Sequence, residues 1–211
     1  MNNSRSMHIF DKSARVISVI FHPLLMPVYG MVIIFSAPTL HGYIPFAFKK
    51  LLVLILLVNN VLLPLSILPF FIHWNIISSW TISERRERII PLILTTILYS
   101  VTAIIIFRFP VSAFLKSYIF ATSFLSLLVT IINFWWKISI HSVGAGALIA
   151  IVLILSFKMY TPLLWYLIPS IIAGGLLLSS RLQLNLHNPQ QVWFGFLAGF
   201  FGLSSVLMLF Q

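Results

Sequence analysis

An arginine and a histidine lie six positions apart between two strongly apolar segments near the C-terminal end of the chain. They are Arg181 and His187, in the stretch of residues 180–191, SRLQLNLHNPQQ. Such side chains are costly to place at the junction of two membrane helices, and they commonly mark a site. A guanidinium binds phosphate oxygens, and an imidazole can serve as nucleophile, base or acid. The pair therefore predicts a functional site at this junction.

A second group of polar residues opens the fifth apolar segment. Lys137, Ser139 and His141 precede the small residues 143–147, VGAGA. Small residues in the first turns of a helix let a ligand approach the exposed backbone amides, where an anion is favoured, or they let another helix pack closely. Both interpretations are open for the small residues, and His141 beside Lys137 favours the first.

The only charge-dense loop is residues 75–88, which leads directly into the third apolar segment. It holds Arg85, Arg86 and Arg88 beside Glu84 and Glu87. Taken alone, this loop is typical of a cytoplasmic connection with an excess of positive charge. Together with the other two places, it indicates an anion site.

The elements that position these residues are membrane helices. Hydrophobic residues make up 60% of the 211 residues, charged residues 8%, and mean hydropathy is +1.08, so an all-α, polytopic membrane bundle is expected. A crossing takes about 20 residues, which predicts seven spans, with six as the alternative. The predicted spans are 16–37, 49–73, 89–109, 114–135, 142–157, 160–180 and 190–210. We expect a polar segment at 1–15, retained ahead of the first helix, and a single transmembrane domain over 16–211.

Span parity brings the three polar places together. Two spans separate the arginine loop from His141, and two more separate His141 from His187, so all three are predicted at one face of the membrane. Five of the thirteen basic residues gather there: Arg85, Arg86, Arg88, Lys137 and Arg181. This arrangement is expected for a phosphate headgroup whose lipid tail lies in the bilayer.

The net charge of +10 does not indicate nucleic acid, because the basic residues are dispersed between apolar spans. Absence of cysteine excludes disulfides and thiolate metal sites. His8, His22, His41 and His73 lie near span ends or in loops without metal-like spacing, and are attributed to interfacial polarity. The step from Gly195 to Gly199 predicts helix packing.

The motifs resemble those of the type-2 phosphatidic acid phosphatase superfamily, which includes membrane lipid phosphatases and haloperoxidase-related enzymes. The third family motif is Ser-Arg, five residues, His, three residues, Asp. Here Ser180-Arg181 is followed by His187 and then by Gln191 in place of Asp. The second motif, Pro-Ser-Gly-His, is matched by Ser139 and His141 alone, and the first, a Lys with Arg-Pro, loosely by residues 85–91, RRERIIP. The pattern is similar to a divergent bacterial branch of the superfamily.

This resemblance implies a role for each matching residue. His187 would be the nucleophile that forms a phosphohistidine, and His141 the acid that protonates the departing alcohol. The phosphoryl oxygens would be held by Arg181, Arg85, Arg86, Arg88, Lys137 and Ser139. Neither a metal nor another cofactor is implied. Gln191 supplies no negative charge to the nucleophile, and Glu84 or Glu87 is expected to compensate.

Three functional hypotheses follow. The first is a lipid or isoprenoid phosphate phosphatase in a bacterial cytoplasmic membrane, with phosphorylated lipid as substrate. The second is a non-catalytic descendant that binds an anionic lipid headgroup. The third, a transporter or scaffold whose polar residues pack the bundle, is less consistent with polar residues gathered at one face.

Overall fold

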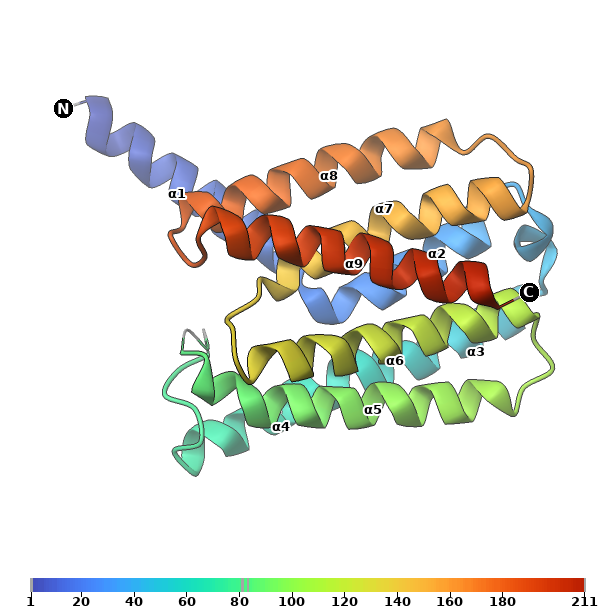
Figure 1. Cartoon of the computed structure of the whole chain (residues 1–211), viewed down its shortest axis with the longest axis horizontal. Coiled ribbons are helices and arrows are strands. Elements are labelled where there is room, and N and C mark those ends of the chain that lie inside the picture. The colour runs from blue at the N-terminus through green and yellow to red at the C-terminus, as the bar shows by residue number, and fades with distance from the viewer. Residues whose placement is uncertain (1, 81, 83, 211) are drawn as a thin grey trace.

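The protein is described by a computed structural model that places residues 2–80, 82 and 84–210, with side chains placed from residue 10 onward within α1. These residues form an all-α bundle in which seven helical segments are long and apolar enough to cross a membrane (Figure 1). The all-α, polytopic membrane bundle expected from the sequence is confirmed, and the length and composition of the described helices favour seven spans over six. These spans are Phe10–Ser36, Phe46–His73, Arg86–Phe107, Ala113–Asn133, Ile140–Lys158, Leu164–Gln183 and Pro189–Leu209.

The helical elements follow one another along the chain with short connections. The first two spans comprise α1 (Asn2–Ile20), η1 (Pro23–Leu25), α2 (Met26–Ser36), η2 (Leu40–Tyr43) in the connection, α3 (Phe46–Leu56), the π segment η3 (Leu57–Leu62) and α4 (Leu63–His73). The remaining five comprise η4 (Arg86–Arg88), α5 (Ile89–Phe107), α6 (Ala113–Asn133), α7 (Ile140–Lys158), α8 (Leu164–Gln183) and α9 (Pro189–Leu209).

The first span is broken near its middle, as its prolines require. Pro23 and Pro27 lack an amide hydrogen, so α1 ends at Ile20 and a single 3-10 turn precedes α2. The Nδ1 atom of His22 accepts a hydrogen bond from the Leu24 amide and caps that turn. The polar residues at the start of the chain continue directly into this span, so the boundary predicted between residues 15 and 16 falls inside α1.

Among the described residues, the most extensive contact between two helices is that of α7 with α9. A Cβ atom at Gly199 would collide with the carbonyl oxygen of Val143, and one at Gly146 with the backbone of Phe196. Of the two interpretations open for the small residues of α7, close helix packing therefore accounts for Gly146. Gly195 serves the same purpose, because its Cβ would lie 2.7 Å from the carbonyl oxygen of Ser139.

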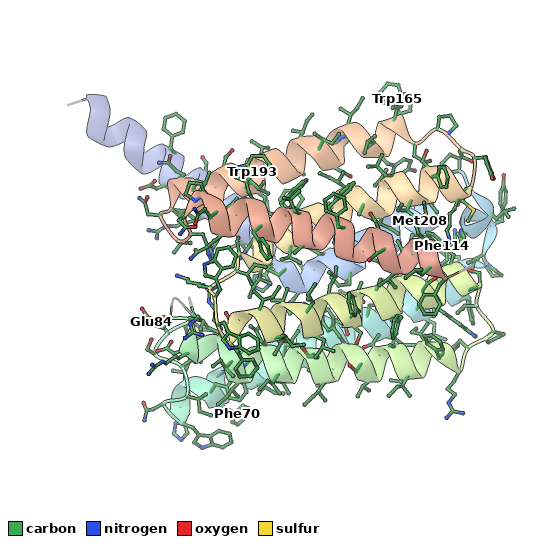
Figure 2. All side chains as sticks on the ribbon, viewed as in Figure 1. Phe70, Glu84, Phe114, Trp165, Trp193 and Met208 are labelled. Carbon is green, nitrogen blue, oxygen red and sulfur yellow. The ribbon has the colours of Figure 1, made fainter. Side chains whose placement is uncertain are left out.

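Up-and-down topology brings the connections α4–α5, α6–α7 and α8–α9 to one end of the bundle, where α1 also enters (Figure 1). Glu84 and Trp193 lie toward this end, whereas Phe114 and Trp165 lie toward the opposite one (Figure 2). The arginine loop before α5, the start of α7 and the connection from α8 to α9 therefore lie at the same end of the bundle, as predicted.

Candidate functional site

The His187 imidazole is held by the first turn of α9. Asn188 is the N-cap of this helix, and its side chain accepts a hydrogen bond from the Gln191 amide at 2.8 Å. The Gln191 side chain returns the contact, because its Oε1 accepts from the Asn188 amide at 3.3 Å. This reciprocal capping box fixes the position of Gln191. The same Oε1 lies 2.9 Å from Nδ1 of His187.

The capping box also decides which nitrogen of His187 carries the proton. A backbone N–H can only donate, so the atom of Gln191 that it meets is the carbonyl oxygen rather than the amide nitrogen. That oxygen in turn requires Nδ1 of His187 to be the donor. In the neutral ring Nε2 is then unprotonated, which is the state that a nucleophilic imidazole needs.

The electrostatic surroundings keep the imidazole neutral at pH 7. The pKa of His187 is lowered to about 4, chiefly by burial, and the hydrogen bond to Gln191 only partly offsets this effect. The positive charges of Arg88, Arg181 and Lys137 contribute to the same lowering. An anion bound among these cations would raise the pKa again.

Arg181, in the last turn of α8, is buried and only partly satisfied. Its side chain is 7% exposed, its Nη1 donates to the hydroxyl of Ser18 at 3.2 Å, and its Nε has no hydrogen-bond partner among the described residues. A buried guanidinium with an open donor is unfavourable unless an anion offsets its charge.

His141 meets the same residue of α1 through the backbone. Its Nε2 lies 3.2 Å from the carbonyl oxygen of Ser18, so this nitrogen carries the proton and donates it. Its ring also packs edge-on against His22, with centroids 5.8 Å apart. Ser18 therefore links the α7 histidine to the α8 arginine.

The three arginines of the loop before α5 have different positions. Arg88 is 9% exposed and donates from Nε to the Ile82 carbonyl at 2.9 Å. Arg85 turns to the end of α6, where it donates to the carbonyls of Asn133 and Phe134, and Asn133 donates back to the Arg85 carbonyl. Arg86 is exposed. Of the three, Arg88 alone lines the cavity described below.

The other predicted site residues lie outside that cavity. Ser139 is fully buried, accepts from the hydroxyl of Ser142 and donates its amide to the Gln191 carbonyl at 3.3 Å, so it joins the starts of α7 and α9. Burial and, to a smaller extent, the positive charge of Arg88 lower the pKa of Lys137. Glu84 is exposed and acts electrostatically on Arg88 and Lys137. Glu87 accepts from the amide and hydroxyl of Ser78. Neither glutamate has a described contact with His187, so nothing in this geometry supports the expected compensation for Gln191.

A cavity of about 590 Å³ connects the polar residues to the interior of the bundle. Arg88, His141, Arg181 and His187 line its polar end. Mostly apolar side chains of six spans line the remainder, among them Leu68, Phe71, Leu92, Leu125, Ile151 and Leu203, together with the hydroxyl-bearing side chains of Thr95, Tyr99, Tyr118, Thr122 and Ser126. No aspartate or glutamate is among the described residues that line it. The cavity therefore offers a cationic end and a mostly apolar interior.

Three lining residues at the polar end were not predicted from the sequence: Arg15, Ser18 and His22. His22 was attributed to interfacial polarity, and this attribution is incomplete because its ring contacts His141. His22 lies beyond the end of α1, but the spacing of three residues that places Arg15 and Ser18 on one face of that helix is a signal that the sequence did contain. It was too weak to interpret without knowing what this face contacts.

Comparisons of the chain with protein-family models, with curated proteins and with solved structures gave no match.

Proposed function

We propose that the protein is a phosphatase of lipid or isoprenoid phosphates in a bacterial cytoplasmic membrane, acting through a phosphohistidine. The observation that carries the proposal is the His187 ring, whose proton is fixed on Nδ1 by Gln191, at a cavity end that also holds Arg88 and Arg181. Phosphoryl transfer depends mainly on positioning and on stabilisation of charge. The cationic end of the cavity can position the phosphate group and stabilise its charge, while the mostly apolar interior accommodates the lipid chain.

The reaction would proceed in two steps. Nε2 of His187 attacks phosphorus, a P–N bond forms, and the P–O bond to the lipid alcohol breaks. The bound phosphate anion favours the imidazolium form of His141, which gives its Nε2 proton to the departing oxygen in place of the Ser18 carbonyl and is left as the neutral ring. Water then attacks phosphorus, its proton passes to His141, and the P–N bond breaks to release inorganic phosphate. Arg88 and Arg181 stabilise the phosphoryl oxygens in both steps.

A non-catalytic lipid-binding protein is the second candidate function, and Gln191 is the observation that favours it. A carboxylate at this position would stabilise the positive charge that develops on His187, whereas an amide contributes only a dipole. In a serine protease triad, neutralising the carboxylate that supports the histidine lowers turnover about 10⁴-fold. The two candidates share the same ligand and differ in turnover.

The test is phosphate release by the purified protein in detergent. The substrates are phosphatidic acid, phosphatidylglycerophosphate and a polyprenyl diphosphate, and His187→Ala is the control. We expect release from at least one substrate and a loss of at least 10³-fold in His187→Ala, because the nucleophile is removed. Lipid binding without release would favour the second candidate, and neither binding nor release would contradict both.

A further inference from the structure

The polar end of the cavity has a second wall, which the N-terminal span supplies. Arg15 and Ser18 lie on one face of α1, His22 follows the end of that helix, and all three line the cavity. Ser18 binds Arg181 through its hydroxyl and His141 through its carbonyl. The His22 ring lies against His141. This wall is therefore joined to the proposed catalytic residues and faces the same ligand.

The charge at this end exceeds what one phosphate group can offset. The wall adds Arg15 to Arg88 and Arg181, so three guanidiniums line the cavity, and no carboxylate lines it among the described residues. A phosphate monoester carries about two negative charges at neutral pH. A diphosphate monoester has one more ionised oxygen, which would match the third guanidinium. His22 adds a donor, because its Nδ1 accepts from the Leu24 amide and the ring proton must be on Nε2.

We propose that Arg15, Ser18 and His22 form a second phosphoryl subsite, which makes the protein selective for lipid diphosphates over lipid monophosphates. This inference rests on the proposed function and names its substrate class. The phosphoryl group that is transferred lies at His187, and the group attached to the lipid lies at the wall. His187 forms a bond to the terminal phosphorus, the bond from that phosphorus to the bridging oxygen breaks, and the lipid monophosphate leaves with this oxygen. Water then releases orthophosphate from His187.

The subsite is tested by binding, in a His187→Ala background that prevents turnover. The probes are farnesyl diphosphate and farnesyl monophosphate, titrated calorimetrically into the detergent-solubilised full chain. Arg15→Gln removes the third guanidinium from an exposed position, and His22→Asn removes the ring donor while leaving an acceptor for the Leu24 amide. Lys12→Gln is the matched control, because Lys12 is an exposed cation on the same helix and does not line the cavity.

We expect the His187→Ala protein without further substitution to bind farnesyl diphosphate at least tenfold more tightly than farnesyl monophosphate. Arg15→Gln and His22→Asn should each weaken diphosphate binding about tenfold, because a charge-assisted hydrogen bond is lost, and monophosphate binding less than twofold. Lys12→Gln should leave both affinities unchanged. Equal affinities for the two probes, or equal losses for both in Arg15→Gln, would overturn the subsite and leave the proposed function standing. Binding of neither probe to the His187→Ala protein would also overturn the subsite, whereas the proposed function is tested separately by phosphate release from the three lipids.

Discussion

The contact between His187 and Gln191 separates two properties that a carboxylate would supply together. The glutamine oxygen orients the imidazole, since the capping box of α9 fixes that oxygen and with it the proton on Nδ1. It does not stabilise the imidazolium charge of a phosphohistidine intermediate. Gln191 therefore orients the His187 ring as a carboxylate would, but it supplies no negative charge.

Restoring the charge should therefore raise turnover without altering the geometry. Gln191→Glu keeps the side-chain length and the N3 position of the capping box, where glutamate is as suitable as glutamine. We expect kcat for phosphate release to rise at least tenfold, because a carboxylate stabilises the positive ring. Gln190→Glu is the control, since it adds the same charge at an exposed neighbouring position. Equal effects of the two variants would show that only the general field had changed.

The same variant has a pH signature with a definite sign. The pKa of His187 is lowered to about 4, so the free imidazole stays unprotonated well below pH 7. A carboxylate partner favours the protonated ring and raises this pKa. Gln191→Glu should consequently lose kcat/KM at a higher pH than the parent as the solution is acidified. Ionisation of the substrate is common to both proteins and cancels in the comparison.

Replacing each of the three loop arginines should have a different effect on ligand binding and on the free energy of unfolding. Arg88→Ala removes a buried cation from the cavity and should weaken binding of a lipid phosphate at least tenfold. Arg85→Ala removes hydrogen bonds to the last carbonyls of α6 and should lower the free energy of unfolding by about 1 kcal/mol with little effect on binding. Arg86→Ala, at an exposed position, is the control for both measurements. Calorimetric binding and thermal unfolding in detergent distinguish the classes, and a larger binding loss in Arg85→Ala than in Arg88→Ala would contradict this assignment.

At the scale of elements, α7 and α9 connect the fold to the site. His141 opens α7, His187 immediately precedes α9, and the Ser139 amide bonds to the Gln191 carbonyl between them. Glycines allow the two helix backbones to touch. The distance between the two histidines therefore depends on residues deep in the bundle.

Gly199→Ala tests this dependence. Its Cβ would meet the carbonyl of Val143, a backbone atom that cannot move without displacing the helix. We expect a loss of about 1–3 kcal/mol in the free energy of unfolding, the usual result of overpacking, together with reduced activity. Gly175→Ala on α8 is the matched control, because nothing lies within 4 Å of its Cβ and alanine favours the helix. Similar unfolding temperatures for the two variants would contradict the argument.

The elements themselves were largely predictable from the sequence, because length and hydropathy determine which segments can cross a bilayer. All seven predicted spans coincide with observed ones to within several residues. The roles of glycines and loop arginines were not predictable in this way. Arg85 and Arg88 have similar local sequence, and only the position of α6 shows that Arg85 binds its last carbonyls.

At the scale of the whole molecule, the cavity is assembled from contacts that are remote in sequence. Arg181 and Ser18 are 163 positions apart, and His141 and Ser18 are 123 apart. Span parity predicted which end of the bundle the motifs share. Parity does not determine which helices are neighbours there, so the contribution of the N-terminal span could not be derived from it.

The seven spans also place the two ends of the bundle on opposite sides of the membrane, but charge alone orients it weakly. The site end and N-terminus hold eight basic residues against five opposite, and excluding all five predicted site residues reverses this to three against five. The eight are Arg5, Lys12, Arg15, Arg85, Arg86, Arg88, Lys137 and Arg181, and the five are Lys49, Lys50, Arg108, Lys116 and Lys158. Because Arg88 and Arg181 are buried in the cavity, excluding only these two leaves six against five. The difference of one residue is too small to decide the orientation by the positive-inside rule.

Single-cysteine labelling in intact cells measures both the topology and the orientation, since the chain has no cysteine of its own. Gln190→Cys lies at the site end and Tyr160→Cys at the opposite end, and both positions are exposed. A membrane-impermeant thiol reagent should label one variant and spare the other, with full labelling of both after permeabilisation as the control. Labelling of Gln190→Cys would place the site outside the cytoplasm, and labelling of Tyr160→Cys would place it inside. Equal labelling of both before permeabilisation would contradict an odd number of crossings between these two residues, and with it the shared end on which the site depends.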